Sequence, residues 1–182
     1  NGVVANLSTT VKPGSGKILV DTSSLLNYPD TQLSGRIAAK VASDYAKVNL
    51  SNVDITYVII ANASMIEGPS AGASMAVSVL LALNNKTNGH VAITGTINPD
   101  GTIGRVGAVL EKARSAKEHG IEIFLVPEGQ INSEDSKKTR TCSTVGGMEI
   151  CRITYQSKTV DIGKIVNMTV YEVSNIGEAY GY

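Results

Sequence analysis

Residues 67–83 have the sequence EGPSAGASMAVSVLLAL, in which a short turn rich in small residues runs directly into a long apolar segment. Pro69 cannot donate a hydrogen bond and pre-sets the chain for the first turn of a helix. Residues 70–83 are apolar around most of the helical circumference, which predicts a helix at the centre of the fold. Gly68 and Gly72 allow other backbone to approach the start of that helix closely.

Strand and helix patterns alternate on both sides of this central segment. The apolar run 54–61 is nearly continuous, which predicts a strand buried on both faces. Ser34 is expected to be an N-cap, residues 98–101 to form a tight turn, and Gly120 to end a helix. Further strands are expected at 3–11, 17–21, 91–97, 121–126 and 168–173, and helices at 34–48, 107–119 and 174–180. The pattern indicates an α+β fold with a mixed β-sheet and helices packed mainly on one face.

The composition is that of one domain spanning residues 1–182, with 42% hydrophobic but only 4% aromatic residues, so aliphatic and alanine packing must dominate. The 16 basic and 16 acidic side chains balance, which gives no reason to expect nucleic acid as a partner. No apolar run approaches the roughly 20 residues that cross a bilayer. The chain begins at Asn1 rather than Met, as an excised soluble fragment would, and a membrane anchor can lie elsewhere in its parent.

Ser70 is the first candidate for a chemical role, because it falls at the start of the central helix. Free N–H groups point outward there, and the helix dipole favours negative charge. A serine in that place can attack a carbonyl, while backbone N–H groups in the segment of Gly68, Pro69 and Ala71 stabilise the oxyanion. The alternative is that Ser70 only caps the helix.

A base that activates Ser70 is harder to find from the residues alone. Neither His90 nor His119 has an obvious partner, so a Ser–His–Asp triad is disfavoured. A lysine can replace histidine when burial leaves its amine neutral. Lys112 flanks the expected buried face of the 107–119 helix, but Lys117 flanks the opposite side. A solvated lysine therefore remains the alternative to a base.

The segment after Gln130 changes character, with an exposed loop expected at 133–140 and a hairpin at 141–153. Cys142 and Cys151 lie symmetrically about Gly146-Gly147. A two-residue turn there places them on a non-hydrogen-bonded pair, with Cα atoms about 4.5 Å apart. This spacing predicts a disulfide, and two free thiols are the alternative. A metal site is not expected, because two ligands are too few.

Five Asn-X-Ser/Thr sequons add a weak indication of location. Together with the expected disulfide, they favour an extracytoplasmic or membrane-associated parent protein. The sequons begin at Asn6, Asn49, Asn62, Asn85 and Asn167.

The 67–83 segment and the run VAITGTINPDGTIGRVGAVLEKARSAKEHGIEIFLVP at 91–127 together resemble the proteolytic domain of the Lon proteases. That family carries its nucleophile in a (D/E)-G-P-S-A-G motif and its base in a G-G-x-x-E-K-like segment. The resemblance implies that Ser70 is the nucleophile and Lys112 the general base. It also implies a fold like that of the second domain of ribosomal protein S5.

Supporting roles follow from the same resemblance. Thr94 matches a threonine that lies beside the lysine in the family, so it is expected to orient the Lys112 amine. Glu67 matches the acidic residue of the motif, and it either pairs with that amine or caps the helix. The chain departs from the family at Thr96, where glutamate is usual, and at Ala108, where glycine is usual.

Residues 131–167 have no counterpart recognised in the family and are expected to be an insertion that carries the hairpin. The function implied is a serine endopeptidase that acts on polypeptides through a Ser–Lys dyad and an acyl-enzyme. No Walker A sequence is present, so no ATPase is expected in these residues, as in the ATPase-free Lon-like peptidases of archaea. The resemblance implies no cofactor. It does imply a homo-oligomer, which in the family is a hexameric ring.

Two other classes of function stay open. A glycine- and serine-rich turn that opens a helix also binds phosphate, as in a small-molecule phosphotransferase of a related fold. Against that reading, no carboxylate cluster for magnesium stands out in the sequence. The second alternative is a catalytically idle assembly or binding domain that retains Ser70 and Lys112 for structural reasons.

Overall fold

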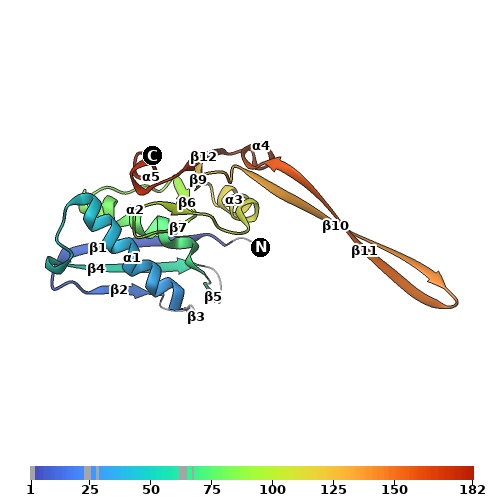
Figure 1. Cartoon of the computed structure of the whole chain (residues 1–182), viewed down its shortest axis with the longest axis horizontal. Coiled ribbons are helices and arrows are strands. Elements are labelled where there is room, and N and C mark those ends of the chain that lie inside the picture. The colour runs from blue at the N-terminus through green and yellow to red at the C-terminus, as the bar shows by residue number, and fades with distance from the viewer. Residues whose placement is uncertain (1–2, 23–25, 28, 62–64, 67) are drawn as a thin grey trace.

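A computed structural model describes residues 3–22, 26–27, 29–61, 65–66 and 68–182 of the chain. Two three-stranded sheets form the body of the protein (Figure 1). In the first sheet the order is β1-β4-β2, with β1 antiparallel and β2 parallel to β4, so this sheet is mixed as expected. The bounds are Ala5–Pro13 for β1, Ile18–Asp21 for β2 and Val53–Ala61 for β4.

The second sheet is entirely parallel, in the order β12-β9-β6. Its strands are β6 (Val91–Ile93), β9 (Ile123–Pro127) and β12 (Thr169–Val173). The strand expected at 91–97 is interrupted at Thr94 and Gly95, and resumes as β7 (Thr96–Ile97), which pairs with β8 (Ile103–Gly104). This interruption positions the candidate site, because Gly95 bonds to the start of the central helix while Thr94 bonds to β9.

Helices complete the fold, and none in the described part of the chain has the length and apolar character needed to cross a bilayer. Helices α1 and α2 pack with β4 around the main core, which is rich in alanine (Ala38, Ala42 and Ala76 are fully buried). Helix α3 packs with β9, β12 and α4 around a second core. The helices are α1 (Pro29–Ala46), α2 (Gly72–Leu83), α3 (Val109–Glu118), α4 (Ile162–Val166) and α5 (Ile176–Tyr180). Shorter elements are the 3-10 turns η1 (Leu50–Asn52) and η2 (Pro69–Ala71), and the pair β3 (Leu26–Asn27) and β5 (Met65–Ile66).

Two local expectations are wrong. Helix α1 begins at Pro29 rather than near Ser34, since a proline suits the first turn, and Ser34 is buried inside the helix instead of capping it. Strand β4 is not buried on both faces, because Tyr57 is fully buried whereas Ile60 is 62% exposed. Helices α1 and α2 cover only one face of this sheet, so the side chains of β4 alternate between core and solvent.

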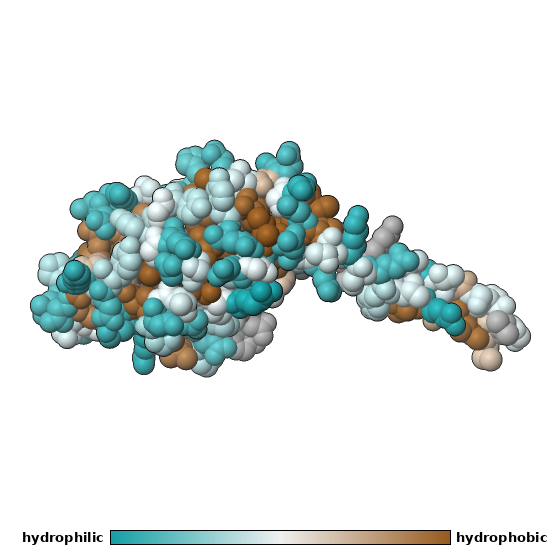
Figure 2. Space-filling view, turned by 45° about the horizontal axis from the view of Figure 1, so that its top comes forward, coloured by the Kyte–Doolittle hydropathy of each residue, from teal (hydrophilic) through white to brown (hydrophobic). Residues whose placement is uncertain are grey.

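A long two-stranded ribbon formed by β10 (Asn132–Val145) and β11 (Met148–Asp161) projects from the body (Figure 1). The expectation of a loop at 133–140 is therefore wrong, because these residues continue β10 down to the base of the ribbon. The register about Gly146-Gly147 is confirmed, with Cys142 opposite Cys151. Figure 2 shows hydrophobic and hydrophilic residues mixed along the ribbon, and the exposed apolar ones include Met148 and Tyr155.

Candidate active site

Ser70 lies in η2, the single 3-10 turn that leads directly into α2. Gly68 precedes this turn with a φ of 83°, a left-handed conformation that glycine adopts without strain. A side chain at position 68 would meet nothing within 4 Å, so Gly68 serves the backbone conformation rather than a close approach. Ser70 is half-buried. The N–H groups of Ser70 and Ala71 lie in the first turn of this helical segment, where N–H groups lack an intrahelical acceptor. Pro69 has no N–H to offer.

The Ser70 turn is tied to the break between β6 and β7 by two backbone hydrogen bonds. Gly95 N–H donates to the Ser70 carbonyl at 3.0 Å, and Ala73 N–H donates to the Gly95 carbonyl at 3.0 Å. Gly72 allows this proximity, because a Cβ there would lie 2.9 Å from the Ile97 nitrogen. The position of Ser70 thus depends on a close backbone contact as well as on its own turn.

Gly72→Ala tests that contact. The added methyl group would overlap the Ile97 backbone, so we expect a loss of about 1–3 kcal/mol in the free energy of unfolding. Denaturant unfolding measures the loss. Gly89→Ala is the matched control, because a Cβ at Gly89 meets nothing within 4 Å and should leave stability nearly unchanged. Equal stabilities of the two variants would contradict the close approach.

Lys112 lies in the first turn of α3. It is half-buried, whereas Lys117 on the same helix is exposed. Burial lowers the pKa of the Lys112 amine from its ordinary value. Among the described residues, the amine donates one hydrogen bond, to Thr94 Oγ1 at 3.3 Å, and none to Ser70. Thr94 itself is 5% exposed, and its N–H donates to the Leu125 carbonyl of β9.

Ser70 and Lys112 line the same cleft, which has a volume of about 320 Å³. Both residues also line a larger, open groove of about 1330 Å³ between β1, α2 and β6, which Thr94 shares. Ser70 and Lys112 therefore border both hollows. The other residues of the smaller cleft are Gly68, Pro69, Thr96, Arg105, Val106 and Gly107.

Arg105 in this cleft was missed by the sequence reasoning. It lies between β8 and α3, and its guanidinium donates to the Gly129 carbonyl at 3.2 Å. Its only signal in the sequence is its place in the segment that leads to Lys112. Glu67 lies outside the described residues.

The two histidines lie elsewhere. His119 Nδ1 is 2.8 Å from the Ser115 carbonyl of its own helix. His90 Nδ1 lies 3.5 Å from a Glu122 carboxylate oxygen, and both side chains are exposed. Neither histidine lines a hollow that Ser70 lines. Among the described residues, Lys112 is the lysine that lines both hollows with Ser70, whereas Lys86 lines only the larger one.

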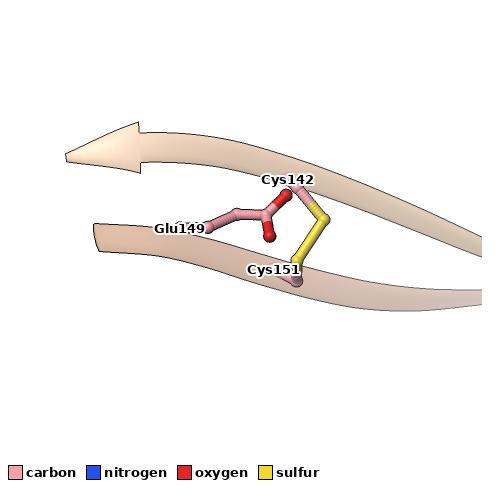
Figure 3. Close-up of side chains that lie close together, drawn as sticks. All are labelled: Cys142, Glu149 and Cys151. Carbon is pink, nitrogen blue, oxygen red and sulfur yellow. A yellow bond between two sulfur atoms is a disulfide. The ribbon is translucent and has the colours of Figure 1, made fainter. Parts of the chain in front are cut away.

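The cysteines lie on the ribbon, outside both hollows around Ser70. Cys142 and Cys151 form a disulfide with their Cα atoms 4.0 Å apart. Figure 3 shows the Glu149 side chain reaching toward this disulfide from β11.

The fold and the cleft together define an α+β domain in which a helix-start serine and a partly buried lysine share one cleft. Residues 31–163 match the family model described as the Lon protease (S16) C-terminal proteolytic domain. This match covers well over half of the chain and runs across the ribbon. The chain belongs to this family.

Known proteins similar to the chain include Lon proteases of a fungus, a bacterium and an archaeon. The mitochondrial Lon protease homolog of Saccharomyces cerevisiae is 42% identical over 67 residues, which are 36% of this chain and 6% of that protein. The Lon protease of Mesomycoplasma hyopneumoniae is 32% identical over 133 residues, 70% of this chain and 15% of that protein. The archaeal Lon protease of Thermoplasma volcanium is 28% identical over 134 residues, 71% of this chain and 20% of that protein. The chain therefore spans a fifth or less of each relative.

Proposed function

We propose that the chain is a serine endopeptidase domain that hydrolyses polypeptides with Ser70 as nucleophile and Lys112 as general base. The observation that carries the proposal is that a helix-start serine and a partly buried lysine line one cleft. Only a neutral amine can accept the serine proton, and burial lowers the pKa of Lys112 toward that form. Membership of the Lon proteolytic-domain family supports the same reaction.

In the proposed reaction, the neutral Lys112 amine accepts the Ser70 proton as Ser70 Oγ attacks the peptide carbonyl. The N–H groups of the η2 turn stabilise the oxyanion, and the dipole of α2 adds to this effect. Lys112 then donates the proton to the leaving amine of the substrate. In the second step the Lys112 amine deprotonates a water molecule, which hydrolyses the acyl-enzyme.

Thr94 is proposed to position the amine. Its hydroxyl accepts the hydrogen bond from Lys112, and its own backbone is held by β9, so the acceptor is fixed in place. For proton transfer the amine must turn from Thr94 toward Ser70, as hydrogen bonds at active sites commonly tighten only when substrate binds. Glu67 is proposed either to pair with this amine in a resting state or to cap the helix.

The pH dependence of peptide hydrolysis tests the proposed base. The folded-state pKa of Lys112 is lowered, so its neutral form becomes abundant at lower pH than for a solvated lysine. We expect kcat/KM to rise with pH and to level off at a pH below the ordinary pKa of a lysine side chain. A midpoint at or above the ordinary lysine pKa, or a profile without any rise, would exclude Lys112 as the titrating base.

The proposal extends to the setting of the domain. The chain is proposed to be a single domain in which 131–167 is an insertion, to form a homo-oligomer, and to cleave peptides without nucleotide. The disulfide between Cys142 and Cys151 supports an extracytoplasmic or membrane-associated parent protein, because disulfides persist in oxidising compartments.

A further inference from the structure

The two strands of the ribbon are joined by the β10–β11 ladder and by one disulfide. Among the described strands the ribbon forms a separate two-stranded sheet, with no third strand beside β10 or β11. Most of its described side chains are exposed. An isolated two-stranded hairpin is marginally stable in water, and a covalent link across it therefore has a large share in its order.

The two sulfur atoms of this disulfide have different surroundings. Cys142 is exposed, whereas Cys151 is half-buried. The Arg140 guanidinium donates to Cys151 Sγ, with Nη2 at 3.1 Å from the sulfur. On the same face, a Glu149 carboxylate oxygen lies within 4.8 Å of both sulfur atoms. Figure 3 shows this side chain beside the disulfide. A positive and a negative charge therefore flank one solvent-accessible S–S bond.

We propose that Cys142–Cys151 is a thiol-exchange site, at which a small thiol adds to Cys142 and releases Cys151. Access favours attack at Cys142, because this residue is the more exposed of the two. The positive charge of Arg140 also favours attack at Cys142, because it stabilises the negative charge that develops on the departing Cys151 sulfur. Glu149 opposes the reaction, because its carboxylate repels both the incoming thiolate and the departing one.

The exchange balances with two equivalents of thiol. The first thiolate forms an S–S bond to Cys142 Sγ, and the Cys142–Cys151 bond breaks to leave a Cys151 thiolate. A second thiolate attacks the sulfur of the bound small thiol, which releases a low-molecular-weight disulfide and a Cys142 thiolate. The two thiols lose two electrons in total, and the protein disulfide gains them.

Opening the bond should loosen the outer part of the ribbon and leave the body of the domain folded. The described body is built around two hydrophobic cores that contain no residue from the outer half of the ribbon. Trypsin should therefore cleave after Lys138 and Arg140 faster once the disulfide is open. The site would make the order of the projecting ribbon sensitive to thiols in its surroundings.

The rate at which 2-mercaptoethanol opens the disulfide tests the proposed effects of the Arg140 and Glu149 charges. Rates are measured by acid quenching, alkylation of the freed thiols and mass spectrometry. We expect Arg140→Gln to slow opening by about threefold and Glu149→Gln to speed it by a similar factor, since each removes one exposed neighbouring charge. Lys158→Gln, near the base of the ribbon, is the control for a general change of charge and should keep the wild-type rate. Both effects should shrink in 1 M salt.

The position of the trapped adduct decides the direction of attack. Peptide mapping of the early quenched sample should find the mercaptoethanol group mainly on Cys142. An adduct mainly on Cys151, or equal opening rates in the wild type, Arg140→Gln and Glu149→Gln, would overturn the proposal. Because the two charge variants are expected to differ from wild type in opposite directions, a general loosening of the ribbon cannot produce the expected result.

Discussion

Replacing Ser70 by alanine is expected to lower the turnover of an unfolded protein substrate, such as fluorescently labelled casein, by at least about a thousandfold. The alanine removes the only atom that forms the acyl-enzyme in the proposed reaction. The fold should survive, because Ser70 contributes its backbone carbonyl, not its hydroxyl, to the bond from Gly95. Circular dichroism and thermal unfolding of the variant check that the fold is retained.

Ser74→Ala is the matched control for this loss. Ser74 lies one turn further along α2, and its hydroxyl donates to the Ala71 carbonyl at 2.7 Å, so it is already satisfied within the helix. We expect this variant to keep turnover within about threefold of the wild type, as a removed local hydrogen bond has a small effect. Undiminished hydrolysis by Ser70→Ala would end the assignment of the nucleophile.

Replacing Lys112 by methionine is expected to lower turnover by a similar factor. Methionine keeps the length and apolar stem of the side chain but removes the amine that accepts the proton. The midpoint of thermal unfolding should hold or rise near neutral pH, because the lowered pKa of Lys112 shows that burial disfavours its charged form there. Loss of activity with retained stability separates a chemical role from a structural one.

Two further substitutions sharpen the Lys112 result. Lys112→Arg should also be inactive, because a guanidinium stays protonated and cannot serve as a base. Lys117→Met removes an exposed lysine from the same helix and should leave turnover close to that of the wild type. If Lys117→Met were as damaging as Lys112→Met, the loss would reflect the helix and not the amine in the cleft.

Local features of the site could be predicted from the sequence where the backbone imposes special demands. Pro69 predicted the start of the central helix, and the structure has a 3-10 turn there that leads into α2. Gly68 was expected to allow a close backbone approach, but it instead provides the left-handed conformation before this turn. The Gly146-Gly147 pair predicted the register of the ribbon, because a two-residue turn determines which residues face each other. Such features depend on a few neighbouring residues.

Features that depend on tertiary contacts could not be predicted from local pattern. Helical periodicity left Lys112 and Lys117 as alternatives, and only the tertiary structure leaves Lys112 half-buried and Lys117 exposed. Arg105 reaches the cleft because the segment after β8 turns toward Ser70, which no periodicity encodes. The polar residues 133–140 were expected to be a loop, because a ribbon with two solvated faces has no hydrophobic alternation to mark its strands.

The central claim is that a neutral Lys112 amine activates Ser70. The most direct test is the rate at which a fluorophosphonate probe labels Ser70 at increasing pH, measured by peptide mass spectrometry in the wild type and in Lys112→Met. This measurement needs no knowledge of the natural substrate. We expect an adduct on Ser70 that forms faster as pH rises in the wild type and hardly forms in Lys112→Met. Labelling of Ser70 at the same rate in both proteins, or labelling of other serines while Ser70 stays unmodified, would contradict it.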